Sequence, residues 1–263
     1  MNRIDKKFKE LKRRKKKAFI VYITAGDPNL SVTEKLVIAL EKAGADIVEL
    51  GIPFSDPLAD GPTIQAASQR ALKSGTNLMK IFKTVSAVRK KADIPIAFMT
   101  YYNPVLRCGL SGFFKACGRC GVDGLIIPDL PAEEAVEVIR LGRKNRISTI
   151  FLAAPTSTRK RIANIAKNST GFIYYVSLTG VTGARSGLSA GLKSRVRLIK
   201  SITDKPVAVG FGVSNAGQAK EVASVADGVI VGSAIVKIIG EKKDVISRVS
   251  RFANILAKAI HNA

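Results

Sequence analysis

Short apolar segments alternate with amphipathic helical patterns along the whole chain, and this alternation limits the fold more than any other feature. Strands that are buried on both faces of a parallel sheet appear as nearly continuous apolar runs, and helices must connect them. The apolar segments lie at residues 18–24, 46–50, 95–100, 122–127, 147–152, 171–176, 206–209 and 227–231. Eight strand–helix units without a linker predict an α/β fold, a TIM (β/α)8 barrel that residues 1–263 form as a single domain. A doubly wound sheet would show the same alternation, but the count of eight and the loops after strands seven and eight favour the barrel.

Two predicted helices lie outside the eightfold repeat. The basic segment 1–17 predicts an extra N-terminal helix before the first strand, and residues 76–91 predict an extra helix after strand two. In the helical pattern at 31–43, Ser31 and Glu34 have the spacing of a capping box. The other helical patterns cover residues 64–72, 132–145, 158–167, 192–203, 215–224, 235–239 and 244–260.

The composition is that of a folded globular protein, with 46% hydrophobic and 24% charged residues. No apolar run reaches the roughly 18 residues that a membrane helix needs, so we expect no membrane span. The basic start and the apolar run at 18–25 resemble a secretory signal, but Tyr22 and Thr24 interrupt the run and no convincing cleavage site follows. We therefore expect a cytoplasmic protein whose first strand is this run.

The three cysteines, Cys108, Cys117 and Cys120, form no disulfide pattern, and an odd count is typical of a reducing compartment. Cys117 and Cys120 have a C-x-x-C spacing that can begin a zinc site. Cys108 could supply only one further ligand, and the single histidine, His261, lies at the tail. The pattern favours structural thiols over a metal site.

The chain is strongly basic, with 43 Lys and Arg against 20 Asp and Glu, a formal net charge of +23. Lys12–Lys17 is a continuous basic run that could contact nucleic acid. The remaining excess is spread over predicted helix faces, including residues 89–91, 143–144, 159–161 and 242–243, and few aromatic residues are interleaved to stack on bases. A solvated basic surface is therefore favoured over nucleic-acid binding. Its field would also attract a phosphorylated substrate.

One acid interrupts the second apolar strand, and a second acid follows on the next loop. Glu49 lies within an otherwise apolar segment, where a charge needs a reason. Proline and glycine residues between 51 and 62 then fix the path of a loop that carries Asp56 and Asp60. Singly, Glu49 could pair with a lysine at a strand edge, and Asp60 could be a turn or helix-cap residue. Together, at the carboxyl end of a barrel strand, the two acids predict an active site.

Glycine-bearing loops follow strands six, seven and eight, at residues 179–187, 210–214 and 231–234. The last of these loops opens the short helix at 235–239. Glycine lets the backbone approach an anion closely, and helix N-termini direct free N–H groups toward it. Loops in this order in a barrel predict a phosphate site.

The segment Val48-Glu-Leu-Gly-Ile-Pro-Phe-Ser-Asp-Pro-Leu-Ala-Asp-Gly-Pro62 resembles, without a gap, the signature of the tryptophan synthase alpha chain family. Later segments resemble the family as well, so the resemblance covers nearly the whole chain. It implies a TIM barrel with both extra helices and a reversible retro-aldol cleavage of indole-3-glycerol phosphate to indole and glyceraldehyde 3-phosphate. It also implies no cofactor in this chain. The implied partner is a pyridoxal-phosphate beta chain, in a hetero-oligomer of two alpha and two beta chains.

The resemblance also implies roles for individual residues. Glu49 would transfer protons as general acid and base, and Asp60 would accept the indole N–H and stabilise the developing cation. Asp129, near the end of strand four, would organise the loop that carries Asp60, although capping of the helix at Ala132 is an alternative. The expected substrate- and phosphate-binding residues are Tyr174, Thr182, Gly183, Phe211, Gly212, Gly232 and Ser233. Those expected around the indole ring are Tyr22, Ile64 and Tyr102.

Other segments match the family in a more general way. Residues 99–104 and 128–131 would form part of the indole pocket and of the face that meets the beta chain. Residues 181–194 resemble a mobile lid that closes over the substrate. Leu178 stands where some members of the family carry an arginine. For Tyr174, a role as a side chain that fills the barrel remains open.

Several other functions fit parts of the pattern. Phosphate-binding barrels include isomerases of histidine and tryptophan biosynthesis, but the spacing of Glu49 and Asp60 argues against them. An alpha chain that only activates its partner would be expected to have lost these acids, and both are present. A basic barrel recruited to nucleic acid would likewise be expected to have lost them, whereas a lyase that acts alone and releases free indole stays open.

Overall fold

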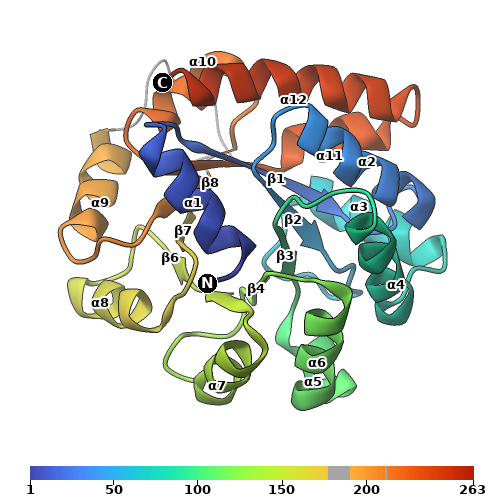
Figure 1. The fold of residues 1–263 in the computed structure, drawn as a ribbon, viewed down its shortest axis with the longest axis horizontal. Coiled ribbons are helices and arrows are strands. Elements are labelled where there is room, and N and C mark those ends of the chain that lie inside the picture. Colours follow the sequence, from blue (N-terminus) through green and yellow to red (C-terminus); the bar gives the residue numbers. More distant parts are fainter. Residues whose placement is uncertain (177–189, 211) are drawn as a thin grey trace.

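The computed structural model describes residues 1–176, 190–210 and 212–263, and in this part of the chain nine parallel strands form one sheet (Figure 1). The strands are β1 (Ala18–Thr24), β2 (Ile47–Gly51), β3 (Ile96–Met99), β4 (Gly124–Ile126), β5 (Ser148–Ile150), β6 (Leu152–Ala153), β7 (Ile173–Val176), β8 (Val207–Gly210) and β9 (Gly228–Val231). Their order is β5-β4-β3-β2-β1-β9-β8-β7-β6. Only Phe151 separates β5 from β6, so the two ends of this order meet in sequence and the sheet curls into a TIM barrel. The predicted fold is confirmed, and the fifth predicted strand is the one that is divided in two.

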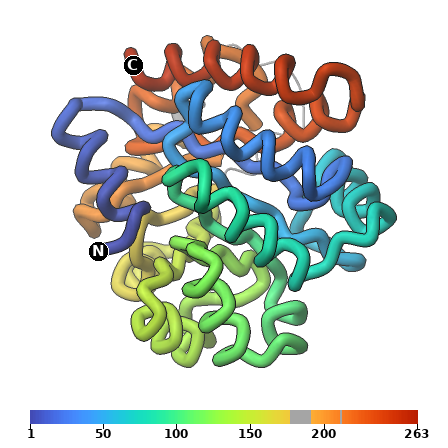
Figure 2. The backbone as a smooth tube through the Cα atoms, turned by 45° about the vertical axis from the view of Figure 1, so that its right-hand side comes forward, coloured from blue at the N-terminus to red at the C-terminus, as the bar shows by residue number. Residues whose placement is uncertain are grey.

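Helices surround the strands in the alternating order that the sequence predicts (Figure 1). Figure 2 shows the long C-terminal helix α12 alongside α2 at one edge of the molecule. The helices are α1 (Arg3–Arg13), α2 (Leu30–Lys42), α3 (Pro62–Lys73), α4 (Leu78–Arg89), α5 (Tyr102–Cys108), α6 (Leu110–Cys120), α7 (Val136–Asn145), α8 (Arg159–Asn168), α9 (Ala190–Lys200), α10 (Ala216–Ala223), α11 (Ser233–Gly240) and α12 (Val245–His261). The extra helices predicted before strand one and after strand two are α1 and α4. No helix in the described residues is long and apolar enough to cross a membrane.

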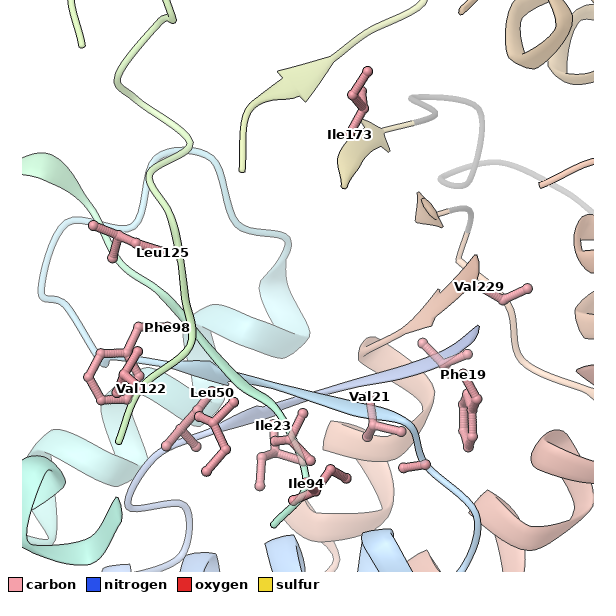
Figure 3. Packing of buried hydrophobic residues seen from close by; sticks show 14 of the residues in the cluster. Phe19, Val21, Ile23, Leu50, Ile94, Phe98, Val122, Leu125, Ile173 and Val229 are labelled. Carbon is pink, nitrogen blue, oxygen red and sulfur yellow. The ribbon is translucent and has the colours of Figure 1, made fainter. Parts of the chain in front are cut away.

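The apolar side chains form two layers. The larger layer lies between the outer faces of the strands and the helices, and Figure 3 shows part of it, including Phe19, Val21 and Ile23 of β1. Alternate residues of the same strand, such as Ile20, point into the barrel. There they pack with Ile4, Phe8 and Leu11 of α1, which close one end of the barrel. The amphipathic N-terminal helix therefore seals the amino ends of the strands.

The starts of α2 and α7 differ from the prediction in a way that changes the role of a predicted residue or turn. The N-cap of α2 is Asn29, whose side chain accepts a hydrogen bond from the N–H of Val32 at 3.0 Å, so the predicted capping box at Ser31 is wrong. Glu34 instead binds the Lys91 ammonium group at 2.8 Å. Helix α7 begins at Val136 and not at residue 132, because turns occupy the residues before it.

The cysteines lie on the helices that follow β3. Cys117 and Cys120 are buried in α6, and the Cys120 thiol donates a hydrogen bond to the carbonyl of Cys117 at 3.3 Å. Cys108 is exposed at the end of α5. The described residues contain no group of three or more His, Cys, Asp or Glu side chains placed to hold a metal ion.

Candidate active site

Glu49 lies in the middle of β2, where every residue is buried. Its register partners are Tyr22 on β1 and Ala97 on β3. The side chain is 0% exposed, and neither carboxylate oxygen has a hydrogen-bond partner among the described residues. Burial raises the pKa of Glu49 to about 8, and the nearby charge of Asp60 contributes to the rise. In the described part of the chain, Glu49 is therefore not paired with a lysine.

Asp60 lies in the loop between β2 and α3, at the same end of the barrel as Glu49. A backbone hydrogen bond from Asp60 N–H to the Pro57 carbonyl, at 3.0 Å, shapes this loop. The Gln65 amide also donates to the Asp60 carbonyl at 2.9 Å. Partial burial raises the pKa of Asp60 to about 6, and a hydrogen bond with the Tyr101 side chain works in the opposite direction. At neutral pH, Glu49 is then mainly protonated and Asp60 mainly ionised.

Tyr101 anchors the Asp60 loop, and the sequence analysis did not single it out. Its hydroxyl oxygen accepts a hydrogen bond from the N–H of Ala59 at 2.8 Å, and its ring lies 5.3 Å from the ring of Phe54. Burial, with the charge of Asp60 as the next cause, raises the pKa of Tyr101 to about 12. The predicted residue Tyr102 is not among the described residues that line the cavity, and it packs against the outer layer. The start of α5 explains the difference, because Tyr101 is the N-cap residue that precedes the helix and Tyr102 is its first helical residue.

A cavity of about 840 Å³ opens at the carboxyl ends of the strands and contains both acids. The predicted residues that line it are Tyr22, Glu49, Asp60, Ile64, Tyr174, Gly212, Gly232 and Ser233. The sequence analysis did not predict several further lining residues, among them Leu58, Leu152, Thr156 and Arg161. The cavity therefore gathers residues from segments that are far apart in the sequence, as TIM-barrel active sites do.

Two tyrosines form the inner wall beside Glu49. Tyr22 and Tyr174 are buried, and burial raises the pKa of each hydroxyl above its ordinary value. The Tyr22 hydroxyl lies 3.4 Å from the Thr24 hydroxyl. A Cβ atom at Gly51 would lie only 2.2 Å from the Tyr22 oxygen, so glycine at this position makes room for the ring. Both hydroxyl groups remain neutral at physiological pH and are available as hydrogen-bond donors.

The wall after β8 and β9 provides backbone groups for an anion. Gly212 has a φ of +64°, a conformation that favours glycine. Gly232 is the N-cap residue of α11, and no side chain caps this helix, so its first N–H groups lack a side-chain partner. By contrast, the side chain of Asn215 caps the neighbouring α10. Gly232 and Ser233 therefore have the arrangement expected of a phosphate site.

Three of the predicted residues lie outside the part of the chain that the structure describes. They are Thr182, Gly183 and Phe211. The position of Leu178 and residues 181–189 of the predicted lid lie outside it as well.

Asp129 binds the start of α5. Both of its carboxylate oxygens accept a hydrogen bond from the N–H of Tyr102, at 2.9 and 3.2 Å. The alternative that Asp129 caps a helix at Ala132 does not hold, because α7 starts only at Val136. The preceding residue, Tyr101, accepts a hydrogen bond from the N–H of Ala59 in the Asp60 loop. Asp129 is therefore linked to this loop through the backbone at the start of α5.

Comparison with known proteins agrees with this geometry. The family model described as "Tryptophan synthase alpha chain" matches residues 8–262. The tryptophan synthase alpha chain of Geotalea daltonii is 53% identical over 237 residues, which are 90% of each chain, and that of Geobacter sulfurreducens is 49% identical over 264 residues and the full length of both. The crystal structure of tryptophan synthase subunit alpha from Legionella pneumophila superposes with a TM-score of 0.93 at 39% identity and covers 100% of both chains. The chain therefore belongs to the tryptophan synthase alpha chain family.

Proposed function

We propose that the Glu49–Asp60 pair carries out the carbon–carbon lyase reaction of this family, the cleavage of indole-3-glycerol phosphate to indole and glyceraldehyde 3-phosphate. The observation that carries the proposal is a fully buried carboxyl group without a hydrogen-bond partner among the described residues, next to a second acid of lower pKa. Two acids whose environments separate their pKa values are suited to different roles in one reaction.

In the proposed mechanism, the protonated Glu49 donates its proton to C3 of the indole ring. The resulting positive charge is shared with the ring nitrogen, where the Asp60 carboxylate accepts the N–H hydrogen bond. The Glu49 carboxylate then takes the proton of the side-chain hydroxyl. The bond between C3 and the glycerol carbon breaks, its electron pair restores the aromatic ring, and the hydroxyl carbon becomes the aldehyde of glyceraldehyde 3-phosphate. Glu49 ends the cycle protonated, so one residue serves as acid and as base.

The rest of the cavity would orient the substrate. Tyr22 and Ile64 line the cavity and would contact the indole ring, and Tyr174 lines the same cavity as Glu49. The backbone at Gly212, Gly232 and Ser233 would bind the phosphate, together with Thr182, Gly183 and Phe211. This reaction needs no cofactor in this chain.

The family implies a complex with a tryptophan synthase beta chain. We propose an assembly of two alpha and two beta chains in which pyridoxal phosphate is bound only by the beta chain. We also propose that residues 1–263 act as a single domain in the cytoplasm and that nucleic acid is not a partner.

The test is a cleavage assay of Glu49→Gln and Asp60→Asn with indole-3-glycerol phosphate. Glutamine keeps the size and polarity of Glu49 but transfers no proton, so activity should fall below detection while substrate still binds. Asparagine offers no negative charge to the ring nitrogen, and the loss should be about 100- to 1,000-fold in kcat. A Glu49→Gln enzyme within tenfold of the unmodified chain would refute the assignment, since tenfold corresponds to only about 1.4 kcal/mol.

A further inference from the structure

Arg161 brings a positive charge to a cavity whose other charged lining residues, in the described part of the chain, are acidic. Those residues are Glu49 and Asp60. Arg161 belongs to the first turn of α8, the helix that follows β6. The side chain of Thr158 accepts a hydrogen bond from the backbone N–H of Arg161 at 3.2 Å, which fixes the base of the arginine side chain.

The charges around Arg161 are opposite to those that favour a helix start. The first turn of α8 contains no acidic residue and begins with Arg159, Lys160 and Arg161. The N-terminus of a helix carries partial positive charge and is stabilised by acids, so three consecutive cations oppose it. Among the described helices, α1 and α7 alone have an acid in the first turn, so α8 is distinguished by its three consecutive cations and not by the lack of an acid. A local rule that is broken beside a cavity points to a function there.

Within the described residues, no acid is in ion-pair distance of Arg161. Glu133, which is exposed, interacts with it electrostatically, and Asp129 lines a small neighbouring pocket together with it. The pKa of Glu133 is lowered first by a backbone hydrogen bond, then by Asn164, and least by Arg161. None of the ion pairs among the described residues includes Arg161. Its charge is therefore available to a ligand in the cavity.

We propose that Arg161 is a specificity-determining cation that favours phosphorylated over unphosphorylated substrates, an inference that rests on the proposed function. The phosphate is expected at Gly212, Gly232 and Ser233, beyond β8 and β9, whereas Arg161 follows β6. These walls are up to three strands apart in the sheet, so the guanidinium group attracts the dianion across the cavity without needing to be its direct ligand. It also offsets the repulsion between the phosphate and the Asp60 carboxylate.

The size of this effect follows from the Coulomb interaction. A single positive charge about 8 Å from a phosphate dianion in water-like surroundings improves binding by about fivefold. Arg161 is exposed, so salt weakens the attraction, and at 0.5 M salt the screening length falls to about 4 Å. The benefit should then largely disappear.

The experiment compares Arg161→Gln, Arg161→Lys and the control Arg251→Gln, which removes the same charge from the exposed face of α12. KM and kcat are measured for indole-3-glycerol phosphate and for indole glycerol, at 0.05 M and 0.5 M salt. Arg161→Gln should raise KM for the phosphorylated substrate about threefold at 0.05 M salt, where screening already reduces the unscreened value, with kcat within twofold and KM for indole glycerol unchanged. Arg161→Lys should restore most of the affinity, and Arg251→Gln should behave like the unmodified chain.

Two results would overturn the inference. One is an unchanged KM in Arg161→Gln, and the other is a lysine variant no better than the glutamine variant, which would mean that shape and not charge matters. Calorimetric titration with glycerol 3-phosphate separates this inference from the proposed function. If the unmodified chain does not cleave the substrate, the proposed function fails, and weaker binding of glycerol 3-phosphate to Arg161→Gln still supports the role of Arg161.

Discussion

The buried carboxyl group of Glu49 connects catalysis with stability at the scale of a single residue. Its pKa is about 8 in the folded chain and 4.5 in the unfolded reference. Between these values the folded state binds more protons, so this group lowers the free energy of unfolding as pH rises. This loss of stability is fully present above pH 8 and disappears below about pH 4.5. A buried acid without a hydrogen-bond partner among the described residues is unfavourable for folding, which agrees with a functional reason for its presence.

We therefore expect Glu49→Gln to be more stable than the unmodified chain at high pH. The stability difference should increase by on the order of 4 kcal/mol between pH 5 and pH 9, because glutamine has no charge to bury. Urea denaturation at both pH values measures it. A difference that is the same at pH 5 and pH 9 would show that Glu49 titrates normally in the folded chain.

The two acids also predict the pH dependence of cleavage. Asp60 acts as an anion, so kcat/KM should fall as the pH drops below about 6. Glu49 acts first as an acid, so kcat/KM should fall as the pH rises above about 8. The result is a bell-shaped profile with a maximum near pH 7. Initial rates from pH 5 to pH 9 test this expectation, and a flat profile would contradict it.

At the scale of structural elements, the hydroxyl of Tyr101 connects the start of α5 to the Asp60 loop. Tyr101→Phe removes the acceptor for the Ala59 N–H and the hydrogen bond with Asp60. We expect kcat to fall by at least about tenfold, which corresponds to about 1.4 kcal/mol, because the carboxylate is no longer held in place. The acidic limb of the pH profile should also move upward, since this hydrogen bond lowers the pKa of Asp60.

The neighbouring Tyr102 provides a matched control. Tyr102→Phe removes one hydroxyl from the adjacent position but keeps the backbone N–H that binds Asp129. Its kcat and pH profile should remain those of the unmodified chain. Equal losses in the two variants would mean that the start of α5, and not the Tyr101 hydroxyl, controls the loop.

The sequence predicted the positions of those elements whose residues are determined by burial. Apolar runs located the strands, and an acid within such a run identified Glu49. Helix starts were less predictable, because Asn29 and Ser31 both have side chains that can cap α2, and tertiary contacts decide between them. Tyr101 and Tyr102 have the same chemistry, and only the path of the backbone between β3 and α5 determines which one contacts the Asp60 loop. Arg161 looked like ordinary solvated surface, since its distance from the cavity depends on how α8 packs after β6.

At the scale of the whole molecule, exposed apolar side chains follow three neighbouring strands of the barrel. Leu58 follows β2, Leu106 lies in α5 after β3, and Val136 begins α7 after β4. These strands are adjacent in the sheet, in the order β4-β3-β2, and the Asp60 loop belongs to the same group of connections. Exposed apolar side chains that converge at one end of a barrel are typical of a protein interface. We expect the beta chain to bind there and to order the Asp60 loop, which raises the rate of cleavage.

Val136 allows this expectation to be tested without altering the cavity, because it is 73% exposed and is not among the described lining residues. Val136→Ser should weaken beta-chain binding by roughly tenfold, in the range of side chains that matter at interfaces, and leave the cleavage activity of the isolated chain unchanged. Ile255→Ser, in α12, is the control, since Ile255 is also exposed, at 50%, but belongs to the helix that packs beside α2. Calorimetric titration into the beta chain, with and without indole plus glycerol 3-phosphate, measures both effects.

Because coupling between sites is reciprocal, ligands in the cavity should tighten beta-chain binding by the same factor by which the beta chain tightens the binding of the ligands. Equal affinities with and without the ligands, together with a cleavage rate that the beta chain does not change, would leave this chain as a lyase that acts alone and releases indole.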